Sequence, residues 1–133
     1  MTTRERVTGL RQWPSVREVV ADPFRWNRSL QVLEAESLPV AEFPQSPQRM
    51  SPATSSFYKA VVNRQLTHSA DPRMARHVMN CCLREDSRGA RVVKDSKNSK
   101  RHIDSAVAGI MALDRAMFGA KPAEFFLLMP EDH

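Results

Sequence analysis

The stretch VREVVADPF, residues 16–24, decides the fold because an apolar run passes directly into a helix start. The valine-rich part, residues 16–21, favours a short buried strand. Asp22 offers a side-chain oxygen that can cap a helix, and Pro23 suits the first helical position, where a missing N–H costs nothing. A strand followed at once by a helix is typical of an α/β protein.

The same helix-start device is assigned to Ser51-Pro52 and Asp71-Pro72. Together the three pairs predict helices over about residues 23–36, 52–66 and 72–80. The first helix has Phe24, Leu30 and Leu33 among its apolar positions. The second is expected to bury Phe57, Ala60 and Val61, with Leu66 as a further candidate, at a spacing close to the helical period.

The remaining segments complete an α/β order. Residues 39–43 favour a second short strand, and the apolar segments 81–84 and 90–93 flank a glycine-containing turn, which predicts a β-hairpin. Residues 103–118 show the strongest helical periodicity, and Gly119 marks the end of that helix. The fold class is therefore α/β, with a mixed sheet, flanking helices and a hairpin. These strands are too few for a complete doubly wound sheet, so we expect part of a larger fold.

The amino-acid composition narrows the classes of protein to which the chain can belong. With 133 residues, 41% of them hydrophobic and 26% charged, the chain is expected to form a single globular domain. Its longest apolar run, residues 125–129, is too short to span a bilayer, and no signal peptide is evident, so we expect a cytoplasmic protein without a membrane partner. The glycines form no phosphate-binding loop, which argues against a nucleotide site. The histidines and the adjacent Cys81 and Cys82 match no zinc pattern.

The positive charge is concentrated in the middle of the chain. Residues 51–103 hold eleven basic and four acidic side chains, and most of the basic ones lie between Arg84 and Arg101. Such a cluster suits a polyanion, such as a nucleic acid backbone. An equally good alternative is a solvated hairpin and loop whose charges serve solubility.

Two aspartates are candidates for chemistry. Asp22 follows a strand at the sheet rim, where ligands of α/β proteins commonly bind, although capping alone would explain it. Asp104 lies in the first turn of the last helix, where the helix dipole favours any acid. It shares a face with Ala108 and Met111, and a basic loop ending at Arg101 precedes it. Carboxylates beside a cationic surface fit a magnesium-dependent site that cuts phosphodiesters.

An ordered series of short stretches carries a family resemblance: VVADPFRW (19–26), FPQ (43–45), MSPA (50–53), LTH (66–68), HVMN (77–80), a lysine at 94 and SKRHIDSAVA (99–108). Over about residues 14–118 the chain resembles the C-terminal nuclease domain of the large terminase subunit of tailed bacteriophages. Residues 119–133 form a C-terminal tail beyond it.

The resemblance implies a partial ribonuclease H-like fold and an endonuclease, dependent on Mg²⁺ or Mn²⁺, that cuts concatemeric phage or prophage DNA during packaging. Three acidic residues bind two metal ions in that family, and the second and third match Asp22 and Asp104, which are the implied catalytic and metal-binding residues. The implied DNA-binding residues are Arg91, Lys94, Lys97, Lys100 and Arg101. Implied partners are double-stranded DNA, the N-terminal part of the terminase, the small terminase subunit and the portal, in a bacterial or phage-infected cell.

The family's first strands, with the first acidic residue, and its ATPase domain should precede residue 10. We expect them to be missing here, so the chain is expected to be a terminase fragment that is inactive by itself. A non-catalytic DNA-binding or packaging-complex module is the alternative from another class. A structural α/β fragment whose acids only cap helices is the third hypothesis.

Overall fold

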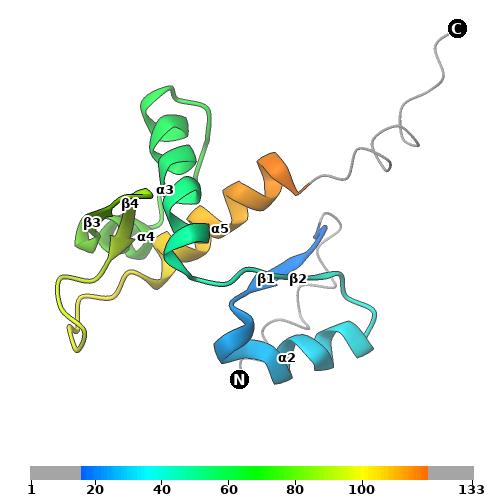
Figure 1. The fold of residues 1–133 in the computed structure, drawn as a ribbon. Helices are drawn as coiled ribbons and strands as arrows, with labels where there is room; N and C mark the ends of the chain where they lie inside the picture. Colours follow the sequence, from blue (N-terminus) through cyan, green and yellow to red (C-terminus); the bar gives the residue numbers. More distant parts are fainter. Residues whose placement is uncertain (1–15, 120–133) are drawn as a thin grey trace, which may run out of the picture. The chain divides into compact units, whose positions relative to one another are not determined.

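The computed structural model describes residues 16–119 (Figure 1). Its elements follow the predicted α/β order: β1 (Val19–Ala21), α2 (Pro23–Ala35), β2 (Val40–Glu42), α3 (Pro47–Val62), α4 (Pro72–Asn80), β3 (Cys82–Asp86), β4 (Gly89–Val93) and α5 (Asp104–Phe118). Contacts group the chain into two compact units, Met1–Arg49 and Met50–His133. In the part of the chain that is described, no helix is both long and apolar enough to cross a membrane.

The first unit is a strand–helix–strand motif. β1 and β2 pair in parallel, with Val19 opposite Val40 and Ala21 opposite Glu42. α2 connects the two strands and packs on β2, burying Leu30 and Leu33. Phe24, which the periodicity groups with these leucines, is instead 93% exposed, because it lies in the first turn, on another side of the helix from the leucine face.

The start of α3 corrects the sequence prediction. The helix begins at Pro47, not at Pro52, and Pro52 lies inside it. Both prolines fit a first helical turn, but the turn at Pro47 is already closed by the N–H of Arg49, which donates to the carbonyl oxygen of Ser46 at 3.1 Å. Ser51 is consequently buried within the helix, and its hydroxyl has no hydrogen-bond partner among the described residues.

The end of α3 also differs from the expectation. The helix stops at Val62 because Arg64 adopts a left-handed backbone conformation, with φ of 55°, and the N–H of Gln65 donates back to the carbonyl oxygen of Ala60 at 2.8 Å. Ala60 is buried as predicted, whereas Val61 is 50% exposed. The helix thus ends four residues before the predicted boundary at 66.

In the second unit α4 packs against α5. The predicted bounds of α4 are confirmed, and Asp71 caps it as expected, accepting from the N–H groups of Arg73 and Met74. The tip of the Met74 side chain lies over Gly109 of α5, 3.0 Å from where a Cβ would stand. Gly119 ends α5 with an ordinary right-handed conformation, φ −84°, so the left-handed cap that a glycine favours is not used there.

β3 and β4 form the predicted antiparallel hairpin, in the register Cys82 opposite Val93 and Asp86 opposite Gly89. Two residues make the turn, and Gly89 follows them with a φ of +115°, a conformation that other residues rarely adopt. The carboxylate of Asp86 braces the turn by accepting from the N–H of Arg88 at 2.8 Å.

Candidate functional site

Asp22 occupies the junction between β1 and α2, at the carboxyl end of a parallel strand. Its Oδ1 accepts a hydrogen bond from the backbone N–H of Phe24 at 2.9 Å, so the side chain caps α2 as predicted. A carboxylate has about four lone-pair sites, and this bond uses one of them. Asp22 therefore has capacity left for a second partner, including a cation.

Asp104 is the first residue of α5, and its side chain is 79% exposed. Ile103 occupies the capping position and offers no side-chain acceptor. Oδ2 of Asp104 lies 3.8 Å from Nδ1 of His102, and no capping bond involves this carboxylate. A negative charge in the first helical turn is favoured by the helix dipole. The carboxylate thus stands at a helix start without the structural task that Asp22 and Asp71 perform.

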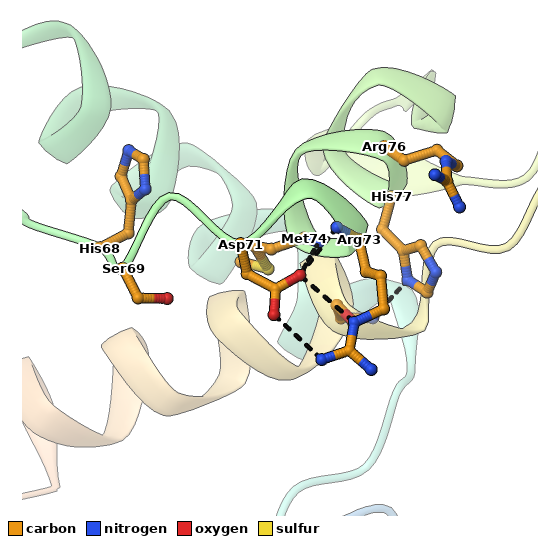
Figure 2. Close-up of a pocket in the computed structure, with 8 residues that line it drawn as sticks. His68, Ser69, Asp71, Arg73, Met74, Arg76 and His77 are labelled. Atoms are coloured by element: carbon orange, nitrogen blue, oxygen red, sulfur yellow. Dashed lines mark hydrogen bonds and ion pairs between the residues drawn. The ribbon is translucent and has the colours of Figure 1, made fainter.

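The N-terminus of α5 is instead fixed by side chains from α4. Nδ1 of His77 accepts a hydrogen bond from the backbone N–H of Ser105 at 2.9 Å (Figure 2). Nδ2 of Asn80 donates to the carbonyl oxygen of His102 at 3.0 Å. These two bonds hold the backbone on both sides of Asp104, so α4 positions the residue that carries the candidate carboxylate.

The sequence pattern does not reveal this support from α4. The stretch HVMN contributed to the family resemblance, but neither His77 nor Asn80 was predicted to act at the site. The available signal was their spacing of three residues, which places two hydrogen-bonding side chains on one face of a helix. The partner segment, near residue 104, could not be read from that spacing.

The two candidate carboxylates belong to different compact units, Asp22 to the first and Asp104 to the second. Each unit by itself places its aspartate at the start of a helix. Their proximity in a shared metal site stays a prediction. Within residues 16–119, no group of three or more His, Cys, Asp or Glu side chains is arranged to hold a metal ion.

Two of the five predicted DNA-binding residues are engaged in ion pairs. Nη1 of Arg91 lies 3.0 Å from Oδ2 of Asp86, and Nη1 of Arg101 lies 3.8 Å from Oδ2 of Asp95. A hydrogen bond from Ser99 is the main cause of a lowered pKa at Asp95, and Arg101 adds a smaller effect. These arginines therefore have part of their charge balanced locally.

The three predicted lysines differ from the arginines. Lys94 is half-buried just after β4, whereas Lys97 and Lys100 are exposed in the loop that leads to α5. None of the three has an ion pair with any other residue in the described part of the chain. We call Lys94, Lys97 and Lys100 the lysine loop. It presents unbalanced positive charge along the segment that ends at Asp104.

The donor chemistry fits a divalent cation better than a soft metal. Mg²⁺ and Mn²⁺ prefer carboxylate and water oxygens, and Asp22 and Asp104 supply carboxylates. The exposed, uncapped side chain of Asp104 can take a cation without breaking a structural bond. Cys81, by contrast, is half-buried, and burial raises the pKa of its thiol, which disfavours the thiolate that soft metals require.

Comparison with known proteins gives a consistent match. Residues 6–120 match the family model described as the terminase large subunit, endonuclease domain. Among solved structures, the large terminase of bacteriophage HK97 superposes with a TM-score of 0.69 at 20% sequence identity, over 83% of this chain and 23% of that one. This chain thus spans less than a quarter of the HK97 protein. A search of curated proteins found no match.

Proposed function

Because the chain belongs to the family of terminase large subunit endonuclease domains, we propose that one nuclease-like domain, over about residues 14–118, serves metal-dependent cutting of concatemeric viral DNA. The proposed framework is ribonuclease H-like. The observation that carries the proposal is the carboxylate of Asp104, which is held at the start of α5 by α4 and is left without a capping bond.

The proposed catalytic residues are Asp22 and Asp104, as ligands of Mg²⁺ or Mn²⁺. Divalent ions, when bound, stabilise the attacking and leaving oxygens during displacement at phosphorus. His77 and Asn80 fix the backbone around Asp104 and so reduce the reorganisation needed for binding. Asp22 keeps its cap to Phe24 while offering its other lone pairs.

The proposed DNA contacts come from the lysine loop, with Arg91 and Arg101 beside it. Lysine contacts to phosphates are independent of sequence, and each releases condensed counterions from the duplex. Binding should therefore weaken steeply as salt rises. Such contacts would place the duplex along the segment that leads to Asp104, which is where a cutting site needs it.

The proposed partners follow from the family. They are double-stranded DNA, the remaining part of a large terminase, the small terminase subunit and the portal, acting in the cytoplasm of a bacterial or phage-infected cell. The match over 23% of the HK97 terminase supports the view that this chain corresponds to one part of such an enzyme.

The proposal is tested by measuring duplex affinity of the full chain in EDTA and in Mn²⁺. We expect Mn²⁺ to strengthen binding, because a cation on the carboxylates offsets their repulsion of phosphate. Asp104→Asn should remove the gain from Mn²⁺ and leave affinity in EDTA unchanged or slightly higher. Asp71→Asn is the matched control, since Asp71 is an aspartate at a helix start that is already paired with Arg73. Equal Mn²⁺ effects in all three proteins would refute the metal role of Asp104.

The second candidate function is a DNA-binding module without catalysis. The observation that favours it is the unbalanced charge of the lysine loop, which requires no carboxylate. This alternative predicts that duplex affinity is independent of Mn²⁺ and survives replacement of both Asp22 and Asp104, whereas the metal-dependent function predicts loss of the Mn²⁺ effect.

A further inference from the structure

The second unit has a hollow of about 610 Å³ on the α4 side of α5 (Figure 2). Neither the candidate carboxylates nor the lysine loop lines it. The side chains around it are mainly cationic or hydrogen-bonding, and they include His68, Asp71, Arg73, Arg76, His77 and Ser105. Ser105 directly follows Asp104 in the sequence, so the hollow opens beside the start of α5.

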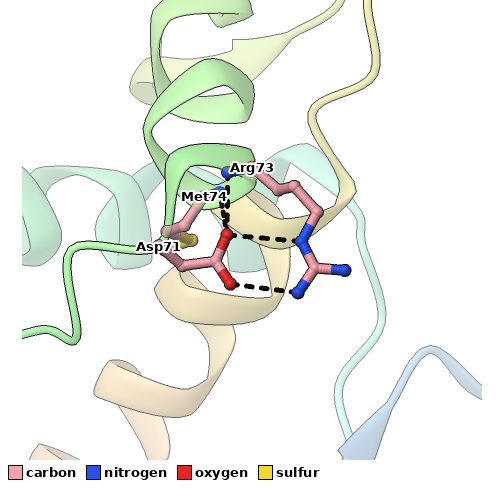
Figure 3. A network of polar contacts seen from close by, with 3 residues as sticks. All are labelled: Asp71, Arg73 and Met74. Atoms are coloured by element: carbon pink, nitrogen blue, oxygen red, sulfur yellow. Dashed lines mark hydrogen bonds and ion pairs between the residues drawn. The ribbon is translucent and has the colours of Figure 1, made fainter.

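The single acid of the hollow is already neutralised. Nη2 of Arg73 lies 3.1 Å from Oδ2 of Asp71, and Nε donates to Oδ1 at 3.4 Å (Figure 3). Hydrogen bonds from the side chain and backbone of Arg73 lower the pKa of Asp71 to about 2. Asp71 therefore stays ionised, caps α4 and holds Arg73, leaving no free negative charge to oppose an anion.

Arg76 supplies positive charge that no acid balances. It is exposed, lies three residues after Arg73 on α4, and has no ion pair within residues 16–119. Positions three apart share a helix face. In Figure 2 Arg76 lies next to His77 on α4, and its side chain points away from Asp71. The net charge of Asp71, Arg73 and Arg76 together is thus positive.

Both histidines accept a backbone hydrogen bond at Nδ1. Nδ1 of His77 accepts from the N–H of Ser105, and Nδ1 of His68 accepts from the N–H of Ala70 at 3.0 Å. A neutral imidazole that accepts at Nδ1 carries its proton on Nε2. Each ring therefore carries an Nε2–H donor, and both histidines are among the side chains that line the hollow.

We propose that this hollow binds a phosphate group of duplex DNA, with Arg76 as its main charged ligand. Arginine presents several N–H donors in a plane and matches the geometry of phosphate oxygens. The inference rests on the proposed function, because a phosphate bound beside Ser105 extends the DNA contact from the lysine loop across the start of α5 onto α4. Free inorganic phosphate offers the same oxygen acceptors and negative charge, so it is the other ligand that the hollow could bind.

The test is duplex affinity of the full chain, measured by fluorescence anisotropy between about 50 and 200 mM salt. Arg76→Gln should weaken binding about 3- to 10-fold near the middle of this range and reduce the slope of log affinity against log salt by about 0.9, the value for one phosphate contact. Lys59→Gln is the matched control, because Lys59 is an exposed cation on α3 that does not line the hollow. It should leave both quantities unchanged.

Two further arms separate the possible failures. If the lysine loop holds DNA, Lys97→Gln should weaken duplex binding. Should Lys97→Gln lose affinity while Arg76→Gln binds like the wild-type chain, the phosphate site in the hollow is overturned and the proposed function is kept. Titration of inorganic phosphate, followed by the ring-proton NMR signals of His68 and His77, tests the other source. Shifts caused by phosphate but not by the duplex would overturn the assignment to DNA, and undetectable duplex binding by the wild-type chain would overturn both proposals.

Discussion

Three aspartates stand at helix starts, and their surroundings give them different roles. Asp22 and Asp71 accept hydrogen bonds from the first turn of their own helices. Asp104 is itself the first helical residue of α5, after the capping position at Ile103, and no capping bond is made there. The N–H of Ser105 donates instead to the imidazole of His77 on α4, so the carboxylate of Asp104 is available for a ligand.

Replacing His77 by alanine should destabilise the protein by about 0.5–2 kcal/mol, the usual cost of losing a helix cap. The change leaves the N–H of Ser105 without its acceptor and loosens α4 from α5. Urea unfolding measures the loss. Met79→Ala is the control, because Met79 lies on the same helix and is 83% exposed. Equal losses in both variants would show that the imidazole bond contributes nothing specific.

Asp71 should make stability depend on pH under acidic conditions. Its pKa is lowered from the ordinary 3.8 to about 2, chiefly by hydrogen bonds from Arg73. The unfolded chain therefore takes up the proton first as pH falls, and the stabilisation from the carboxylate is full above about pH 4 and lost as the pH drops through about 2.

Asp71→Asn keeps a capping oxygen but cannot be charged, so it isolates this effect. The wild-type chain should melt at a higher temperature than the variant near neutral pH, and the difference should shrink between about pH 4 and pH 2. A difference in melting temperature that is constant across this range would contradict the assignment.

Among the helices and strands, the correct predictions concern features that are set by residues close together in the sequence. The start of α4 follows from Asp71-Pro72, and the hairpin follows from two short apolar segments around Gly89. The predicted start of α3 is wrong because Pro47 and Pro52 both follow a serine and carry the same helix-start signal. The choice between them depends on the turn that closes at Ser46. Two equivalent local signals cannot be ranked without the surrounding backbone.

The hairpin turn should be sensitive at Gly89, whose φ of +115° suits glycine and strains other residues. A Cβ there would meet no atom within 4 Å, so the cost of Gly89→Ala is one of backbone conformation and not of crowding. We expect a loss of about 1–2 kcal/mol in the free energy of unfolding. Ser87→Ala, in the same turn, should change it little. A Gly89→Ala variant as stable as the wild-type chain would contradict the turn geometry.

At the scale of the whole molecule, the family was predictable because the matching stretches occur in one order along most of the chain, and the family match over residues 6–120 confirms it. The candidate carboxylates were predicted on the same basis. The support of Asp104 by His77 and Asn80 was not, because those hydrogen bonds join residues more than twenty positions apart and no local periodicity encodes such contacts.

The lysine loop should dominate the salt dependence of DNA binding. Lys97→Gln and Lys100→Gln together remove two exposed charges, which should reduce the slope of log affinity against log salt by about 0.9 for each contact. The double variant Arg25→Gln and Arg28→Gln, on α2, removes the same charge from exposed helical positions and serves as the control. Equal slopes for the two double variants would indicate a general effect of net charge and not a defined DNA surface.

A Mn²⁺ titration, followed by the electron paramagnetic resonance signal of free Mn²⁺, tests whether Asp22 and Asp104 share a metal site. It compares the full wild-type chain with Asp22→Asn, Asp104→Asn and the double variant. Asparagine preserves the cap at Asp22, so folding is not the variable. If both carboxylates bind one metal cluster, each single variant should weaken Mn²⁺ binding about 10-fold or more. The loss of binding free energy in the double variant should then be much smaller than the sum of the losses in the two single variants. Additive losses, or a single variant that binds Mn²⁺ like the wild-type chain, would contradict a shared metal site.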